Sequence, residues 1–322
     1  MICLNNDYSY KLDNFKAIET IKMRYIILGI YAACILFVHF RGKARLPFLR
    51  QIFDHSSFVS PINIFVYLFS KVPTKHAYLP TSQFEDLKLL RDNWQVIRDE
   101  AVALGQLEKI KAAETNNDVG FNSFFKKGWK RFYLKWYEAK HPSAVMFCPK
   151  TVALLNQTPS IKAAMFAELP PGAKLNPHRD PYAGSLRYHL GLVTPNDDRC
   201  FINVNNETYS WRDGEDVLFD ETYIHWALNG GDVTRIILLC DLERPMKYKW
   251  AQSINRWLGR VVMTAGSSPN ETGDQTGGVN KVFHVFWVFG QYKRRLKKFS
   301  KPLYQVIKFG LIIGVAALIY YS

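Results

Sequence analysis

The residues best suited to chemistry lie between positions 176 and 245. His178 and Asp180 form a His-x-Asp pair, His225 follows later in the chain, and Arg235 comes soon after His225. Two imidazoles and one carboxylate can occupy one face of an octahedral ferrous ion and leave three coordination positions open. A metal that must hold both a cosubstrate and O2 requires such open positions. Arg235 would offer a two-pronged hydrogen-bond donor to a carboxylate of that cosubstrate.

The residues after this pair indicate the elements that must position it. Residues 186–192 alternate in the manner of a β-strand, with Arg187 and His189 on one face and apolar side chains on the other. Further β-prone runs occupy residues 201–204, 217–219 and 234–241, separated by turn-forming residues. Short strands with polar residues directed at a shared interior predict a mainly β fold with flanking helices, a double-stranded β-helix of the jelly-roll or cupin type.

Each candidate ligand also has a simpler interpretation. A single histidine on a strand is most often a structural or surface group, and Asp180 before Pro181 is also typical of a turn. Asp220 and Glu221 lie close to His225 in the sequence and compete with Asp180 as a carboxylate ligand. The histidine and aspartate pattern is weak by itself and gains specificity from the basic residues that accompany it.

Longer motifs surround these residues, at positions 176–192, 211–214, 219–225 and 234–236. They resemble the aspartyl/asparaginyl β-hydroxylase family of 2-oxoglutarate oxygenases. Residues 38–43 and 53–56 are similar to the bacterial members of that family that hydroxylate the 2-position of a lipid A secondary acyl chain. The resemblance extends from about Met23 to about Met246.

The resemblance implies a particular set of site residues and cofactors. The iron ligands would be His178 and His225, and the 2-oxoglutarate contacts would be Arg235, Arg187 and His189. The implied cofactors are Fe(II), 2-oxoglutarate as cosubstrate, and O2. Animal peptidyl hydroxylases carry glycine at the position of Asp180, so we expect a site with three protein ligands here. They also carry a serine that helps hold 2-oxoglutarate at the position of Ala167, and alanine has no hydroxyl for that contact.

Charge and apolar segments predict where this chemistry takes place. The chain has 322 residues and a net charge of +14, which indicates an anionic partner. Apolar runs at residues 25–40 and 303–321 favour an anionic membrane as that partner and no nucleic acid. Basic clusters lie on the inner side of both runs. The positive-inside rule therefore predicts anchors at both ends and a catalytic domain facing the cytoplasm at a bacterial inner membrane.

Composition divides the chain into regions. We expect a polar extension at 1–24, a membrane anchor at 25–40, a juxtamembrane or interfacial segment at 41–80, the oxygenase domain at 81–263, a flexible linker at 264–280, a basic juxtamembrane segment at 281–302 and a second anchor at 303–321. The linker is predicted from its many Gly, Ser, Thr and Asn residues. Five cysteines without a Cys-x-x-Cys pair argue against a disulfide framework and a structural zinc site.

Two segments of the expected oxygenase domain precede the His-x-Asp pair. Phe84, Trp94, Ile97 and Leu104 fall near helical spacing and predict a helix on the outside of the barrel. Residues 128–137 interleave basic and aromatic side chains. They are interpreted as a strand whose basic residues lie near lipid phosphates, with an ordinary structural strand as the alternative.

These observations predict a membrane-bound Fe(II)/2-oxoglutarate-dependent dioxygenase. Its substrate would be lipid A or a related acylated phosphoglycolipid, hydroxylated at the 2-position of a secondary acyl chain. One alternative is a membrane-anchored peptidyl aspartyl/asparaginyl β-hydroxylase. The other is a non-catalytic, cupin-like module that binds lipid.

Overall fold

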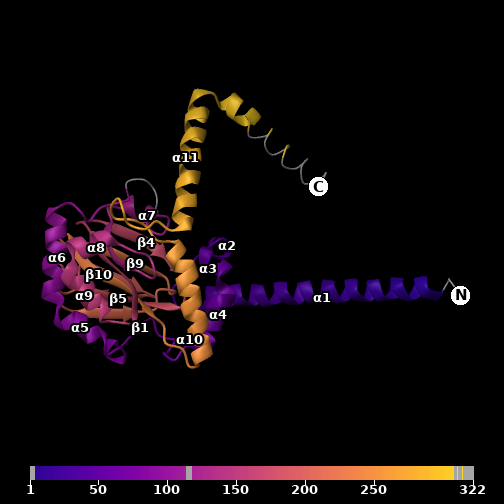
Figure 1. Cartoon of the computed structure of the whole chain (residues 1–322), viewed down its shortest axis with the longest axis horizontal. Coiled ribbons are helices and arrows are strands. Elements are labelled where there is room, and N and C mark those ends of the chain that lie inside the picture. The colour runs from indigo at the N-terminus through magenta and orange to yellow at the C-terminus, as the bar shows by residue number, and fades with distance from the viewer. Residues whose placement is uncertain (1–3, 114–117, 308–309, 311–313, 315–322) are drawn as a thin grey trace.

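Two antiparallel β-sheets form the centre of the molecule in the computed structural model, which describes residues 4–113, 118–307, 310 and 314 (Figure 1). The strands are β1 (Tyr78–Leu79), β2 (Lys130–Trp136), β3 (Ile161–Leu169), β4 (Lys174–His178), β5 (Ser185–Val193), β6 (Cys200–Val204), β7 (Glu207–Ser210), β8 (Asp216–Phe219), β9 (His225–Asn229) and β10 (Arg235–Glu243). The larger sheet has the order β1-β8-β5-β10-β3-β2, and the smaller has the order β4-β9-β6-β7.

The connectivity of these strands is that of a jelly roll. From β3 to β6 the chain passes from one sheet to the other at every step, and β8, β9 and β10 repeat this alternation. Neighbouring strands within each sheet are antiparallel. The prediction of a mainly β, jelly-roll fold with flanking helices is confirmed for the described residues.

Helices cover the barrel and extend from it. Those before the barrel are α1 (Leu4–Phe40), α2 (Phe48–Ile52), α3 (His55–Phe58), α4 (Ser60–Phe69), η1 (Thr81–Gln83), α5 (Leu87–Asp92) and α6 (Trp94–Gln106). The others are α7 (Asn122–Phe125), α8 (Pro142–Phe147), α9 (Pro149–Asn156), α10 (Lys249–Leu258), the π-helix η2 (Gly259–Met263) and α11 (Gly278–Phe299). Figure 1 shows α5, α6, α8 and α9 on one side of the barrel and α10 with the base of α1 on the other.

Strand β5 has the two faces that its alternation predicts. Leu186, Tyr188, Leu190 and Leu192 are fully buried in the apolar layer between the larger sheet and its covering helices. Burying one such side chain stabilises the fold by about 1.5–3 kcal/mol. The opposite face of β5 therefore points into the space between the two sheets.

The predicted outer helix is present and is divided into α5 and α6. Asn93 ends α5 and begins α6, and its side-chain amide donates to the carbonyl of Leu89 at 2.8 Å. Ile97, Ala101 and Leu104 of α6 are buried in the apolar layer beneath it. The helical periodicity thus marks the packed face correctly, although it does not indicate the break.

The segment at 264–277 is bound to the barrel, so the prediction of a flexible linker over 264–280 is wrong. The side chain of Asn270 accepts from the backbone N–H of Tyr133 at 2.7 Å and donates to its carbonyl at 2.8 Å. Arg131 is buried, pairs with Asp118 at 3.0 Å and donates to Ser268 at 2.9 Å. Short polar side chains here act as a substitute strand along the edge of β2. Arg131 is therefore not a lipid contact, and the alternative of a structural strand holds for it.

Helix α1 leaves the barrel as a long projection (Figure 1). In the described part of the chain, residues 22–40 form the one helical segment long and apolar enough to cross a membrane. Most of its large apolar side chains are exposed. Of the second anchor predicted at 303–321, only residues 303–307, 310 and 314 lie among the described residues.

The base of α1 is fixed to the barrel by buried polar contacts. Arg41 donates to Thr222 Oγ1 at 2.6 Å and pairs with Asp220 at 2.7 Å. Arg179 donates to the carbonyl of Val38 at 2.8 Å. The motif at residues 38–43 therefore contacts the segments that carry the predicted metal ligands, because Arg179 adjoins two of them and Thr222 precedes the third.

Candidate metal centre

The structure brings His178, Asp180 and His225 together at one end of the barrel. His178 ends β4, His225 begins β9, and the two are paired in register across these strands. One ligand atom from each of the three residues lies within 4.8 Å of the others, and the distance from His178 Nε2 to Asp180 Oδ1 is 3.8 Å. Two imidazole nitrogens and a carboxylate oxygen at this spacing suit a divalent metal with open coordination positions.

Both imidazoles are oriented by backbone carbonyls. His178 Nδ1 lies 2.8 Å from the carbonyl of Asn176, and His225 Nδ1 lies 2.9 Å from that of Tyr223. A carbonyl only accepts, so each Nδ1 donates and each Nε2 keeps a lone pair for a metal. Burial lowers the pKa of His178, and burial together with His178 lowers the pKa of His225 to about 3. At neutral pH both rings are therefore neutral, as metal ligation requires.

Arg187 lies behind Asp180 and is surrounded by carboxylates. It donates to Asp180 at 2.6 Å and to Glu221 at 2.6 Å, and it lies 3.1 Å from Asp241. Burial alone would raise the pKa of Asp180, but Arg187 and the two histidines hold it well below its usual range. Burial raises the pKa values of Glu221 and Asp241, and neighbouring carboxylates add to the effect. Arg187 therefore keeps Asp180 ionised. Its guanidinium is occupied by carboxylates and is not free to bind a cosubstrate.

The two competing carboxylates have other partners. Asp220 accepts from Arg41 and from Arg244, at 2.7 and 2.8 Å. Glu221 accepts from Arg187 and from Ser185, the latter at 2.7 Å. Neither carboxylate belongs to the cluster that could hold a metal in the described part of the chain.

A buried pocket opens from the metal centre between the two sheets. Its lining is mostly apolar and includes Leu175, Ile202, Trp211, Phe219, Ile237 and Leu239, together with His189 and Arg235. Within the described structure, both ring nitrogens of His189, the indole Nε1 of Trp211 and Nε of Arg235 are buried without a hydrogen-bond partner. Leaving such groups unpaired costs about 1–3 kcal/mol each. A ligand that carries several acceptors would remove that cost.

Two arginines line this pocket, and Arg235 is the one that carboxylates do not surround. Its guanidinium lies 4.5 Å from the centre of the Trp211 ring and forms no ion pair with a described carboxylate, although Glu168 is near enough to offset part of the effect of burial on its pKa. Burial lowers the pKa of Arg235 to about 10, so the group is still charged at neutral pH. Burial, followed by Arg187 and Arg235, lowers the pKa of His189 well below its usual range, so this ring is neutral. An unpaired buried cation beside neutral donors suits a dicarboxylate such as 2-oxoglutarate.

Sequence reasoning missed the parts played by Trp211, Glu221 and Asp241. The inward position of Asp241 could have been predicted from strand alternation. Asp241 lies six residues after Arg235 on the same strand, so both side chains lie on its inward face. Asp241 is also in register with Arg187 of β5. The carboxylate cluster around Arg187 depends on this register, which the sequence does not specify.

Replacing Arg187 is expected to weaken the metal centre without removing a ligand. Arg187→Gln leaves Asp180 without its strongest cationic partner, so iron affinity or activity should fall by about 10–100-fold. Iron titration of the purified protein measures the effect, and Arg187→Lys should restore part of it. Arg199→Gln, on the exposed surface beside Asp197, is the matched control. Unchanged iron affinity in a folded Arg187→Gln protein would contradict this role.

Comparison with known proteins shows which family the barrel is similar to. The family model for aspartyl/asparaginyl beta-hydroxylase matches residues 91–245. An ornithine lipid ester-linked acyl 2-hydroxylase of Rhizobium tropici is 37% identical over 149 residues, which is 46% of this chain and 53% of that protein. The aspartyl/asparaginyl beta-hydroxylase of Homo sapiens is 31% identical over 170 residues, 51% of this chain and 22% of that protein.

Among solved structures, a prolyl-4-hydroxylase of Pseudomonas putida is 16% identical, with a TM-score of 0.35, and the match covers 53% of this chain and 94% of that one. The matches to the two curated relatives span about half of the rhizobial protein and less of the human one. The segment matched by the family model contains all three residues of the metal centre and Arg235. Residues 91–245, just under half of this chain, are therefore similar to the aspartyl/asparaginyl β-hydroxylase family.

Proposed function

We propose that this protein is an Fe(II)/2-oxoglutarate-dependent dioxygenase that hydroxylates the 2-position of a lipid A secondary acyl chain, or of a related acylated phosphoglycolipid. The attachment of α1 to the metal centre carries the proposal. Arg41, at the base of α1, binds Asp220 and Thr222, and Val38 accepts from Arg179. A membrane-inserted α1 would therefore hold the metal centre beside the bilayer, where the carbons to be oxidised are acyl carbons.

Ferrous iron and 2-oxoglutarate, when bound, supply the oxidation of an unactivated C–H bond by O2. His178, Asp180 and His225 would hold the iron. Arg235 would bind a carboxylate of 2-oxoglutarate, and the unpaired donors of His189 and Trp211 fit its remaining oxygens. The observation that supports this fit is the set of buried, unsatisfied donors in one pocket.

The protein contributes positioning and the exclusion of water. The apolar side chains of Leu175, Phe219 and Ile237 keep bulk water from the pocket. Arg187 keeps Asp180 ionised, and backbone carbonyls keep the histidine lone pairs directed at the metal position. Oxidation at carbon requires no side-chain acid or base, so the chain acts mainly by holding its reactants in place.

Orientation and location follow from the basic residues after the first apolar segment. Arg41, Lys43, Arg45 and Arg50 follow residues 22–40 on the side of the barrel. We infer a bacterial inner membrane with the barrel in the cytoplasm, since positive residues favour that side. An anionic membrane then accounts for the excess of basic residues, and no nucleic acid is required as a partner.

A membrane-anchored peptidyl aspartyl/asparaginyl β-hydroxylase is the second candidate, favoured by the name of the human relative. The name of the rhizobial relative, an acyl 2-hydroxylase, favours a lipid instead. A non-catalytic lipid-binding module is the third. A non-catalytic module would not require three potential metal ligands beside an unpaired, buried arginine.

The test uses the full chain in detergent with Fe(II), 2-oxoglutarate and either lipid A or peptides that contain Asp and Asn. We expect mass spectrometry to show one added oxygen atom on a lipid A acyl chain and an equal amount of succinate. Hydroxylated peptide with unmodified lipid would replace the lipid proposal by the second candidate. Iron-loaded protein that releases no succinate with any substrate would leave only the third.

A further inference from the structure

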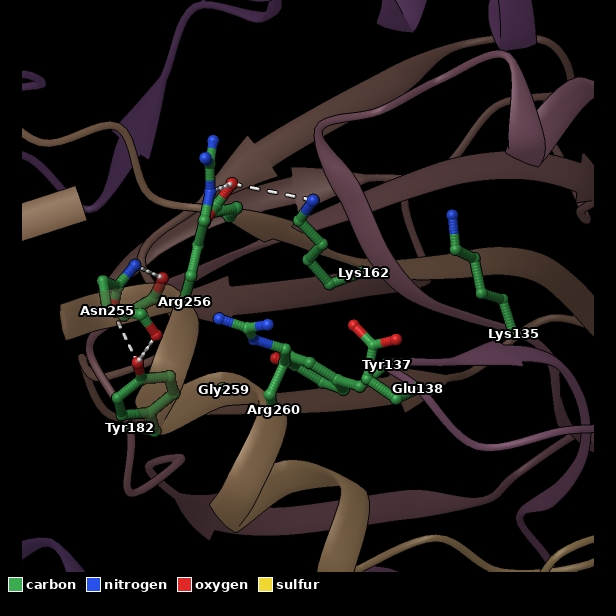
Figure 2. A pocket seen from close by; sticks show the side chains of 11 residues that line it. Lys135, Tyr137, Glu138, Lys162, Tyr182, Asn255, Arg256, Gly259 and Arg260 are labelled. Carbon is green, nitrogen blue, oxygen red and sulfur yellow. Dashed lines mark hydrogen bonds and ion pairs between the residues drawn. The ribbon is translucent and has the colours of Figure 1, made fainter. Parts of the chain in front are cut away.

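A second cleft lies outside the barrel, between α10–η2 and the strands β2 and β3 (Figure 2). Four basic side chains line it, and they outnumber the two acidic ones. The basic residues are Lys135, Lys162, Arg256 and Arg260, and the acidic residues are Glu138 and Glu243. Nothing in the chemistry of the metal centre uses these residues, so their excess positive charge needs another explanation.

Two of these cations lack a carboxylate partner. Glu243 is shared by Arg256 at 2.8 Å and Lys162 at 3.6 Å. Arg260 makes no hydrogen bond or ion pair with the described residues, and Figure 2 shows its guanidinium pointing into the cleft. Lys135 has only a long contact, 3.5 Å to the carbonyl of Leu155. Burial and the nearby Lys162 lower the pKa of Lys135, so an anion would relieve an existing repulsion.

A second space, with a mainly apolar outer part, adjoins this cleft and reaches Asp180 of the metal centre. Tyr182 lines both spaces, with its hydroxyl held by Asn255 of α10. Beyond it the space is lined by Trp136, Val262 and Met263, and at its inner end by Asp180, Arg187 and the carboxylates Glu221 and Asp241 that surround Arg187. Val262 is 57% exposed, so the space reaches the surface at η2. One short helical segment thus separates a cationic surface from a space that is apolar at its outer end and reaches Asp180 at its inner end.

Helix α10 has the composition of a helix at a lipid surface. Ala251 and Asn255 are buried against the barrel, whereas Trp250, Ile254 and Trp257 are exposed. A helix with an exposed aromatic and apolar face beside basic residues is typical of membrane interfaces. Figure 1 shows α10 beside α4 and lying across the direction of α1. This is the arrangement expected of an interfacial helix next to a spanning one.

We propose that this cleft binds the phosphate of the lipid headgroup through Arg260, while the acyl chain enters the adjoining space towards Asp180. The proposal rests on the proposed lipid hydroxylation and adds the headgroup class. A cationic cleft favours phosphate over an ornithine headgroup, because the single carboxylate of ornithine is offset by a positively charged amine. The separation between headgroup and acyl sites would also select which carbon reaches the metal.

The test compares Arg260→Glu with Lys88→Glu, a matched charge reversal at an exposed position of α5, across the barrel from the cleft. Full-length protein in detergent is titrated with lipid A and with dephosphorylated lipid A, followed by tryptophan fluorescence. Loss of one charge-assisted hydrogen bond should weaken binding of the phosphorylated lipid at least about tenfold. The same loss should appear in KM for hydroxylation rather than mainly in kcat. Arg260→Lys should recover part of the affinity, and Lys88→Glu should match the wild type.

Inorganic phosphate separates a headgroup site from a site for free anions. We expect inorganic phosphate to compete only weakly with lipid A, because the acyl chain contributes most of the binding. For the Arg260→Glu variant the competition should be weaker still. Competition by inorganic phosphate as strong as that of lipid A would show a free-anion site and overturn the proposal. Equal weakening for phosphorylated and dephosphorylated lipid would also overturn it. These binding results do not depend on succinate release, so they fail separately from the proposed function.

Discussion

Replacing either His178 or His225 by alanine is expected to abolish hydroxylation and to remove iron from the folded protein. Each imidazole offers an Nε2 lone pair that its Nδ1 hydrogen bond fixes, and the described residues near the centre offer no third histidine ligand. Removing a partner of a ligand already costs about 10–100-fold, so removing a ligand should cost more than about 100-fold. Metal analysis after anaerobic loading and lipid mass spectrometry measure the two losses.

The exposed His76 provides the matched control, and His76→Ala should keep full iron content and activity. The rings of His178 and His225 pack against Phe124 and Phe219, so thermal unfolding of each apo-variant is measured to establish that it still folds. The metal assignment fails if both variants still hydroxylate lipid. It also fails if iron is lost only because the variants unfold, which the thermal measurement reveals.

The parts of this site that the sequence predicts are those governed by local periodicity. The alternation of residues 186–192 places Arg187 and His189 on the inner face of β5, as the structure shows. The expected three residues of the metal site also lie together, because the His-x-Asp pair ends one strand and His225 begins its neighbour. Their roles as ligands remain a prediction, but their proximity follows from the jelly-roll connectivity.

Contacts that depend on register or on distant segments are not predicted. Arg187 is surrounded by Asp180, Glu221 and Asp241, which come from three separate parts of the chain. The residues at 264–277 have the composition of a flexible linker, yet Asn270 acts as a backbone partner for Tyr133. The composition of residues 264–277 shows that this segment has no apolar face. It does not show that short polar side chains can hydrogen-bond to the edge of a sheet.

The N-terminal motifs acquire a physical explanation in the structure. Arg41 binds the loop before His225, and His55 Nε2 lies 2.9 Å from the carbonyl of Arg179, beside His178. These motifs therefore support the segments that carry the metal ligands and join them to the helix proposed to enter the membrane. A change in this region is expected to disturb the metal centre as well as the anchor.

Arg235→Met is expected to weaken 2-oxoglutarate binding and to stabilise the protein without its cosubstrate. Arg235 is buried with no described carboxylate partner, and an uncompensated buried charge opposes folding. Loss of a buried, paired charge in the complex costs about 2–5 kcal/mol, which raises KM for 2-oxoglutarate at least about 30-fold. Each kcal/mol that removal of this buried charge adds to the free energy of unfolding of the free protein raises Tm by about 2–4 °C.

The two opposite effects distinguish a binding residue from a structural one. Succinate release against 2-oxoglutarate concentration gives KM, and thermal unfolding without cosubstrate gives Tm. Arg98→Met, on the outer helix α6, is the control and should change neither value appreciably. A variant that loses both affinity and stability would show that Arg235 supports the fold. A higher Tm together with a much higher KM would show that Arg235 binds the cosubstrate and lowers the stability of the protein when the cosubstrate is absent.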